Sequence, residues 1–252
     1  MILSEITPLI LTKNEIANIE RTLAGLKWAN RIVVIDSEST DGTYELLQSY
    51  SHVDVYRRRF DSHSEQWNYG LEKVETEWVL TLDADYGVPP ELAQEIEDLP
   101  VCPDQNGFRI PFRYCLDGHP LRSSILPPRI ALFRCSKGNY IQDGHTQDLL
   151  LGGECGTLSS PLLHDDRKPF SRWWASQQRY ASLEVDKLRK SNWRDLAPQD
   201  RLRRMIIPAP FVVLIYALCF KGLILEGIPG WKYSLQRFLA EVVLSCHLVK
   251  GS

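Results

Sequence analysis

Two acidic side chains follow one of the most apolar stretches of the chain. Asp83 and Asp85 come directly after residues 78–82, a run that is short and apolar enough to be a strand buried on both faces of a parallel sheet. Residues i and i+2 at a strand end point the same way, and open α/β sheets bind ligands at the carboxyl ends of their strands. The pair could therefore share a divalent cation, although Asp-x-Asp is also common in surface turns.

Other polar side chains follow apolar stretches in the same way. Residues 6–11 and 31–35 predict two strands, each with a polar loop and a helix after it, and residues 64–74 predict a further helix. Repeated strand-loop-helix units favour a parallel sheet with right-handed crossovers, in which the loops line one crevice. The side chains delivered there would be Thr12, Glu15, Asp36, Ser37, Asp41, Asn68, Asp83 and Asp85.

The acids in this set indicate what the crevice would bind. Carboxylates accept hydrogen bonds from a uracil N–H and from ribose hydroxyls, whereas a diphosphate needs a cation between itself and the carboxylates. The chain has no G-x-G-x-x-G after the first strand and no G-x-x-x-x-G-K-[ST], so neither a dinucleotide site nor a P-loop is favoured.

Four motifs stand in a fixed order. They are T-K-N-E at 12–15, V-I-D-S-E-S-T-D-G-T at 34–43, Q-W-N at 66–68 and L-D-A-D at 82–85. Together they resemble the family 2 glycosyltransferases with the GT-A fold, and they are most similar to the branch that adds sugars to lipopolysaccharide core and related bacterial glycolipids. The resemblance is strong over residues 4–92 and weak beyond them.

The resemblance implies an α/β fold of the GT-A type, with a mainly parallel, Rossmann-like sheet flanked by helices. It also implies an inverting transferase that uses a nucleotide sugar, usually UDP-linked, with Mn²⁺ or Mg²⁺. Thr12, Glu15 and Asp36 would hold the nucleoside, with Asn14, Ser37 and Asn68 in the same motifs. Asp83 and Asp85 would border the ribose and the metal. Many members have Lys or Arg where this chain has Trp67, so the resemblance does not imply a direct cationic contact from that position to the diphosphate.

The second half of the first domain would meet the acceptor. Residues 108–114 and 129–134 predict paired strands. Inversion by direct displacement needs a base on the acceptor hydroxyl, and an ionised carboxylate suits that role. The polar cluster at 142–148 predicts Asp148 as the base, with Asp143 second and His145 as an alternative; a hydrogen-bonded turn would explain the same residues.

A further charged cluster follows at residues 164–169. His164 could join the metal or the diphosphate, and Arg167 or Lys168 could supply the cation missing at position 67. Arg113 could meet an anionic acceptor. Ordinary surface charges at a helix start or a sheet edge would account for the same residues.

The C-terminal part predicts helices. Residues 170–190 form one long helical pattern, with Trp173, Trp174, Tyr180 and Leu183 as its packing stripe. A basic cluster at 201–204 precedes the apolar run 205–220, which is too short and too broken by prolines for a comfortable bilayer span. Such a run fits a helix lying on an anionic membrane surface, followed by an amphipathic helix at 235–248; helices that pack together or form a dimer are the alternative.

Composition bounds the remaining possibilities. With 252 residues we expect a GT-A-like domain at 1–165 and a helical, membrane-associating region at 166–252. A net charge of −3 argues against nucleic acid as a partner. The six cysteines lack metal or redox spacing and no signal peptide is evident, which predicts a cytoplasmic protein at the inner membrane face. Two other functions stay open, a sugar-nucleotide nucleotidyltransferase and a non-catalytic nucleotide-binding scaffold.

Overall fold

The computed structural model describes residues 1–123, 125, 127–143 and 146–250. They divide into two compact units: the first is 1–118, 127–142 and 147–167, and the second is 119–123, 125, 143, 146 and 168–250. All six cysteines are free thiols, as expected. His145, the alternative base, lies outside the described residues.

A seven-stranded sheet forms the centre of the first unit, with strand order β12-β6-β9-β4-β1-β2-β3. Strands β4, β1, β2 and β3 are parallel neighbours, and β9 runs antiparallel to both β4 and β6. The predicted mainly parallel sheet is therefore confirmed. The strands are β1 (Ile6–Thr12), β2 (Ile32–Asp36), β3 (Val53–Arg57), β4 (Trp78–Asp83), β6 (Gly107–Ile110), β9 (Arg129–Arg134) and β12 (Cys155–Thr157).

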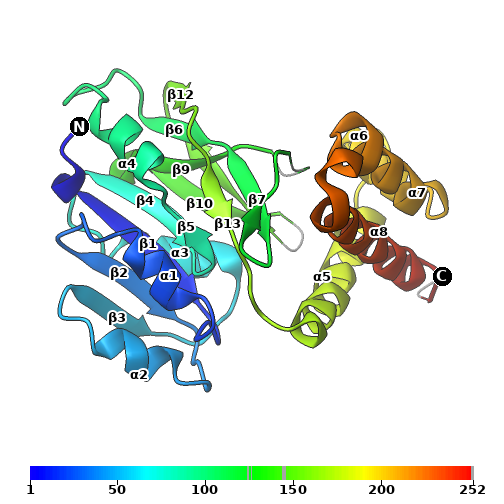
Figure 1. Ribbon diagram of the computed structural model, residues 1–252, viewed down its shortest axis with the longest axis horizontal. Helices are drawn as coiled ribbons and strands as arrows, with labels where there is room; N and C mark the ends of the chain where they lie inside the picture. Colours follow the sequence, from blue (N-terminus) through cyan, green and yellow to red (C-terminus); the bar gives the residue numbers. More distant parts are fainter. Residues whose placement is uncertain (124, 126, 144–145, 251–252) are drawn as a thin grey trace. The chain divides into compact units, whose positions relative to one another are not determined.

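Both faces of this sheet are covered. Helices α1 (Ile19–Ala24), α2 (Thr43–Gln48) and α4 (Pro90–Glu97) pack on one face (Figure 1). Helix α3 (His63–Leu71) and the strand pair β10 (Gly138–Asp143) and β11 (Thr146–Leu151) pack on the other. The strands are apolar on both sides because alternate residues enter opposite cores: Leu80 faces α1 and Val79 faces α3. Short 3₁₀ turns occupy Leu3–Glu5 and Cys135–Lys137.

A second, smaller sheet corrects one prediction. Residues 108–114 were expected to form one strand, but the chain divides at Pro111 into β6 and β7 (Phe112–Leu116), which belong to different sheets. Proline has no N–H to continue a ladder, so the strand changes partner there. Strand β13 (Leu162–His164) pairs parallel with β7 and antiparallel with β5 (Tyr86–Gly87). The short strand β8 (His119–Pro120) follows β7 in the chain.

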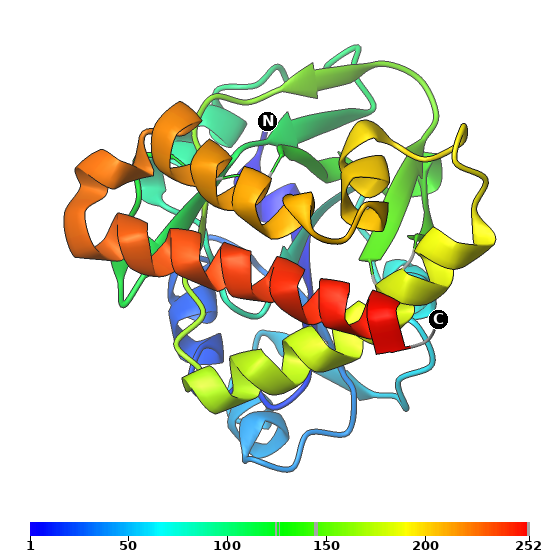
Figure 2. The same ribbon diagram turned by 90° about the vertical axis from the view of Figure 1, so that its right-hand side faces the viewer.

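The second unit is helical. Its elements are α5 (Phe170–Lys190), α6 (Pro198–Arg204), α7 (Pro208–Ile215), a π-helical continuation η3 (Tyr216–Phe220), a 3₁₀ turn η4 (Leu223–Glu226) and α8 (Gly227–Lys250). Figure 2 shows α8 running between α5 and α7. The last helix thus begins eight residues before the predicted Leu235.

The buried face of α5 differs from the predicted one. Val185 and Leu188 pack against Val243 and Leu244 of α8, whereas Trp174 and Leu183 are exposed, so the prediction that these two are packing residues is wrong. The buried face of α5 differs from the predicted one because it includes a charged residue. Glu184 is buried because Arg203 and Lys187 lie within 3.8 and 3.9 Å of it, which compensates its charge.

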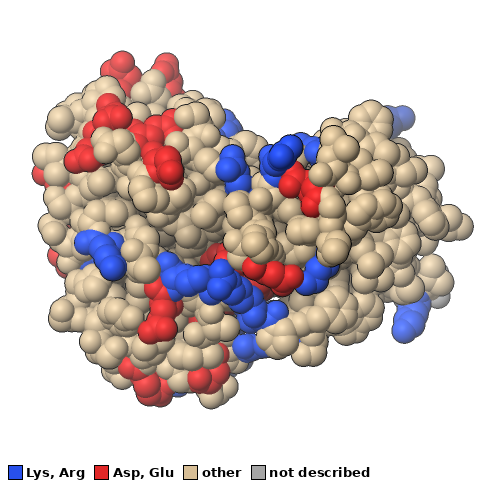
Figure 3. All heavy atoms as spheres, in the orientation of Figure 1, with Lys and Arg blue, Asp and Glu red and all other residues tan. Residues whose placement is uncertain are grey.

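Apolar side chains are unusually exposed around α7 and the start of α8. The most exposed are Ile207, Phe220, Leu225 and Ile228, at 77 to 84%. Figure 3 shows the surface of these helices as largely free of charged side chains on the face in view. Within the described ranges no single helix is long and apolar enough to cross a membrane; Pro208–Phe220 and Leu223–Lys250, bent by 70°, meet the criteria of length and composition only as a pair.

Candidate active site

Three predicted site residues lie at the carboxyl ends of adjacent strands. Thr12 ends β1 and is paired in register with Asp36 at the end of β2, and Asp83 at the end of β4 is paired with Leu11. Arg57 at the end of β3 stands opposite Asp36 on its other side. The parallel sheet therefore brings together the strand-end residues as expected.

Asp36 is the most enclosed acid of this edge, because its side chain is fully buried. Its Oδ2 accepts hydrogen bonds from the Thr12 hydroxyl at 3.0 Å and the Ser39 hydroxyl at 2.5 Å, and its Oδ1 accepts one from the Ser39 N–H at 2.9 Å. A buried carboxylate is tolerated only when donors replace the lost water. Asp36 thus joins the end of β1 to the loop that follows β2.

The loops after β1 and β2 are joined at several further points. The Lys13 ammonium donates to the carbonyl oxygens of Ser37 and Glu38. The Asn14 side chain accepts from the Thr40 N–H at 2.7 Å, and the Glu15 N–H donates to the Thr43 hydroxyl at 2.8 Å. Asn14 and Glu38 both adopt φ = 58°. This conformation suits Asn but is strained for Glu38, so the contacts between the loops hold an uncommon backbone.

Helix α3 supports the other side of the edge. The Gln66 amide donates to the Ser37 hydroxyl at 2.9 Å. The Asn68 side chain donates to the Tyr140 carbonyl and accepts from the Tyr140 N–H, both at 2.9 Å, while Trp67 stacks on the Tyr140 ring. In this structure Asn68 therefore links α3 to β10 through two hydrogen bonds. Its role in nucleotide binding, like that of Ser37, stays a prediction.

The small sheet places His164 next to Asp85. Register pairs set His164 beside Tyr86 of β5 and Tyr114 of β7, and the His164 Nε2 lies 3.3 Å from the Asp85 Oδ2. The two tyrosine rings lie 5.1 and 4.6 Å from the imidazole, centre to centre. Burial alone would lower the pKa of His164, but the charge of Asp85 and its hydrogen bond outweigh burial, and the pKa is raised.

Asp83 and Asp85 act on different neighbours. Asp83 lies near the buried Tyr86 hydroxyl, whose pKa is raised well above its ordinary value, first by burial and then by the charges of Asp83 and Asp85. Asp85 is paired with His164. Across the described part of the chain, no group of three or more His, Cys, Asp or Glu side chains is arranged to hold a metal ion. The sharing of one cation by the two acids stays a prediction.

The predicted catalytic and acceptor residues are more dispersed. Asp148 is exposed on β11, whose Leu149 and Leu151 pack beneath it in the α3 core, and Asp143 ends β10. Arg113 is exposed on β7. Arg167 bonds the Asp165 carboxylate through Nε at 2.9 Å and Nη2 at 2.8 Å, and Lys168 begins the last segment of the second unit.

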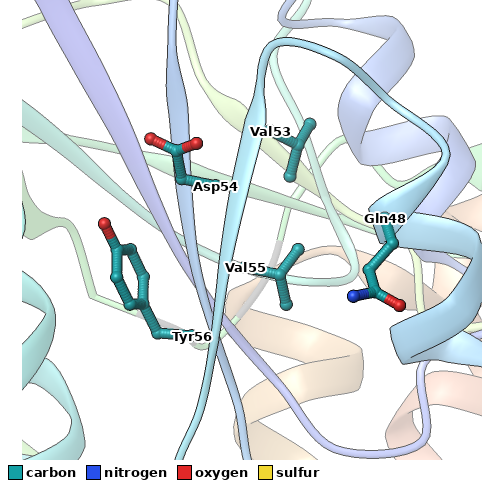
Figure 4. Close-up of a pocket in the computed structure, with 5 residues that line it drawn as sticks. All are labelled: Gln48, Val53, Asp54, Val55 and Tyr56. Atoms are coloured by element: carbon teal, nitrogen blue, oxygen red, sulfur yellow. The ribbon is translucent and has the colours of Figure 1, made fainter.

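A separate hollow of about 320 Å³ opens beside the edge strand β3. Figure 4 shows Val53 and Val55 directed toward Gln48 of α2, with Asp54 and Tyr56 on the opposite side of the strand. None of the predicted site residues lines it. Asp54 already pairs with Arg31 at 2.5 Å, so this hollow is distinct from the strand-end site.

Sequence reasoning missed three residues that shape the site. Ser39 gives Asp36 two of its three hydrogen bonds, and the spacing of three residues could have indicated this turn. Arg57 reaches within 4.0 Å of Asp36, which the parallel register of β2 and β3 could have suggested. Asn18 contacts residues almost 150 positions away, and no local pattern announces that.

Comparison with known proteins bears on the family and the general activity of the chain. Residues 9–102, which hold all four motifs, match the model of glycosyl transferase family 2. The chain contains a glycosyl transferase family 2 domain. It is similar to the lipopolysaccharide core biosynthesis glycosyltransferase LpsC of Rhizobium meliloti, at 25% identity over 81% of this chain and 77% of LpsC. The predicted activity, sugar transfer, is thereby confirmed, and the nucleotidyltransferase and scaffold alternatives are not favoured.

Two further likenesses are more limited. An uncharacterized glycosyltransferase of Rickettsia bellii is 34% identical over 98 residues, which is 38% of this chain and 33% of that protein. Among solved structures, S. aureus TarS 1-349 in complex with UDP-GlcNAc aligns with 94% of this glycosyltransferase and 81% of that chain, at 15% identity and a TM-score of 0.49.

The burial of Asp36 generates a stability prediction. Asp36→Asn places an amide N–H against groups that donate, so we expect the free energy of unfolding to fall by about 2 kcal/mol. The matched control is Asp54→Asn, since Asp54 is 46% exposed and its ion pair should be worth less than about 1 kcal/mol. Urea unfolding followed by tryptophan fluorescence measures both. Equal effects of the two substitutions would contradict the role given to Asp36.

Proposed function

We propose that this glycosyltransferase moves a sugar, with inversion, from a UDP-linked nucleotide sugar to a hydroxyl group of a glycolipid, lipid-linked or polysaccharide acceptor, using Mn²⁺ or Mg²⁺. The observation that carries the proposal is the set of buried and half-buried acids at the ends of β2 and β4, beside Thr12 at the end of β1, with His164 added from the small sheet. The similarity to LpsC over most of the chain supports a lipopolysaccharide-type acceptor.

In this proposal the loops after β1 and β2 hold the nucleoside. Asp36 is fully buried and accepts three hydrogen bonds, so its proposed part in holding the nucleoside is to fix the two loops against which the base and ribose would lie. Thr12 and Glu15 complete this nucleoside contact, with Asn14 and Ser37 shaping the loops. The many cross-loop hydrogen bonds mean that little ordering is left to occur on binding, which favours affinity.

The proposed cation would be held by Asp83 and Asp85, with His164 beside them. Their oxygen and nitrogen atoms are ligands that Mn²⁺ accepts, but these side chains are not arranged as a metal site in this structure. When bound, such a cation would neutralise the charge that grows on the departing nucleoside diphosphate. Arg167 and Lys168 would add positive charge at the diphosphate, and Arg113 would meet an anionic acceptor.

The acceptor hydroxyl must lose its proton as the new bond forms. We assign this step to Asp148, because an exposed carboxylate on β11 is open to an incoming acceptor. Asp143, at the end of β10, is the second choice, followed by His145. Positioning of donor and acceptor in line would supply much of the rate.

Metal-dependent donor binding is the first test. We expect UDP to bind in the presence of Mn²⁺ and Asp85→Asn to weaken that binding by at least about tenfold, because a charged ligand is lost. Asp98→Asn, at an exposed carboxylate directly after α4, should change neither affinity. Isothermal titration calorimetry of UDP with and without Mn²⁺ measures both variants. Equal UDP affinity with and without the metal would contradict the proposed cation.

The assignment of the base has its own test. Asp148→Asn should leave the Kd for UDP unchanged and lower kcat by about 10² to 10⁴, since only proton removal is affected. The same substitution at Asp143 is the internal comparison and should keep most of the activity. Sugar transfer is measured with a radiolabelled UDP-sugar and a lipopolysaccharide acceptor extract. Normal turnover by Asp148→Asn would exclude it as the base.

Peripheral contact with the inner face of the cytoplasmic membrane completes the proposal. Apolar side chains are exposed on adjacent elements around α7 and the start of α8, and exposed apolar groups gathered in this way are typical of membrane or protein contact sites. Arg201 and Arg204 precede this patch, and Lys221 and Lys232 lie within it. Apolar groups beside basic ones suit an anionic lipid surface, where they would bring the site to a lipid-linked acceptor.

The membrane contact predicts a composition-dependent binding. The full chain should sediment with phosphatidylcholine vesicles that contain phosphatidylglycerol and much less with phosphatidylcholine alone. Leu225→Asp with Ile228→Asp should reduce the bound fraction by about tenfold or more, since two of the most exposed apolar groups become charged. Val101→Asp, at a position 67% exposed in the first unit, is the control. Vesicle-independent dimers that the double variant abolishes would show instead that the patch binds a second copy.

A further inference from the structure

The polar side of α1 contacts three separate segments of the candidate site. Asn18, directly before the helix, is 1% exposed although its side chain is polar. Arg21 and Thr22 follow on the same helix. Together they touch the loop after β1, the turn between Asp83 and Asp85, and the residues after His164.

The Asn18 amide uses its full hydrogen-bonding capacity. Its Nδ2 donates to the Glu15 Oε2 at 2.9 Å and to the Asp166 Oδ1 at 3.0 Å. Its Oδ1 accepts from the Arg21 Nη2 at 3.0 Å and from the Arg167 N–H at 3.1 Å. Only a carboxamide can donate twice and accept twice without a charge, so no other side chain of this size replaces it.

Arg21 and Thr22 extend these contacts. The Arg21 Nη2 donates to the Asp165 carbonyl at 2.6 Å, and its Nε lies 3.5 Å from the Asp165 carboxylate. The Thr22 hydroxyl donates to the carbonyl of Ala84, between the two acids, at 2.7 Å. The Asp165 N–H in turn donates to the Asp85 carbonyl at 3.0 Å. Three segments are therefore bound to one short helix: the loop after β1 that contains Glu15, the turn 83–85, and the segment 165–167 after His164.

The two hydrogen bonds that Asn18 donates also reduce the repulsion between two neighbouring carboxylates. Glu15 and Asp166 both bond to the same Nδ2 atom, so their carboxylates are held near one another. Like charges at this range repel unless a donor lies between them. A neutral amide that donates to both permits the approach, and an acid at position 18 would add a third negative charge.

We propose that Asn18 is a positioning residue for donor binding. It holds Glu15 of the nucleoside loop in register with the segment 165–167 that follows His164, so that both sides of the donor site are set before the ligand arrives. This inference rests on the proposed nucleotide-sugar function. It assigns Asn18 a role through Glu15 and Asp166, without contact with the reacting atoms.

The test uses UDP as the probe and the full chain. Asn18→Asp is nearly isosteric, removes both donated hydrogen bonds and should raise the Kd for UDP and the KM for the sugar donor by about 10- to 100-fold. The kcat should change by less than about threefold, because the groups that react are untouched. Asn30→Asp, at an exposed asparagine of the same unit, should leave both constants unchanged.

A compensating substitution separates positioning from general loss of structure. Asp166→Asn alone retains an acceptor for Asn18 and should bind UDP normally. Combined with Asn18→Asp it reverses the donor and acceptor of that hydrogen bond, so the pair should recover at least about tenfold of the lost affinity. A wild-type Kd in Asn18→Asp, or no recovery in the pair, would overturn the role of Asn18.

Limited trypsin digestion provides a readout that does not depend on the ligand. Cleavage after Arg167 requires the segment 165–167 to leave its hydrogen bonds with Asn18 and Arg21. Asn18→Asp should speed this cleavage several-fold, the pair with Asp166→Asn should slow it again, and an unchanged rate would overturn the inference. If wild-type protein fails to bind UDP, the proposed donor is wrong, whereas wild-type binding with unaltered variants rejects the positioning role alone.

Discussion

A fully buried carboxylate at a sheet edge determines the geometry of the first unit. Asp36 has no contact with solvent, so its charge must be met by donors from the protein, and those donors come from the end of β1 and from the loop after β2. Once these hydrogen bonds are made, the two loops have few conformations left. The positive φ of Glu38 is one result, since the contacts around it compensate a strained backbone.

A second constraint comes from the small sheet. His164 is far from Asp85 in the sequence, yet β13 pairs with β5 on one side and β7 on the other, which sets the imidazole beside the carboxylate. The break at Pro111 makes this possible, because it releases β7 from the large sheet to become the partner of β13. Because Pro111 ends the pairing of β6, the strand β7 is free to pair with β13, and this pairing positions His164.

Beside its apolar core, the helical unit buries several charged side chains and exposes several apolar ones. Arg203 lies at 2.9 to 3.8 Å from Glu241, Asp200 and Glu184, and all three acids are buried. Meanwhile Leu225 and Ile228 are 84% exposed. Buried ion pairs fix which helix faces meet without adding much net stability, since desolvation offsets their attraction. The apolar side chains are left to face outward, which is the feature that a lipid surface would use.

The sequence by itself determined which polar residues stand at the ends of the parallel strands in the first unit. Apolar runs followed by Thr12, Asp36 and Asp83 predicted neighbouring strand ends, because parallel strands share one carboxyl edge, and the four motifs predicted the family. Tertiary structure alone decided that Asn18 links Glu15 to Asp166, that β7 leaves the large sheet, and that α5 buries Glu184 in place of Leu183. Local sequence patterns indicate the backbone conformation that a segment prefers and which of its residues face the core. The contacts just named depend on donors and charges that are distant in the sequence, and these come together only when the chain has folded.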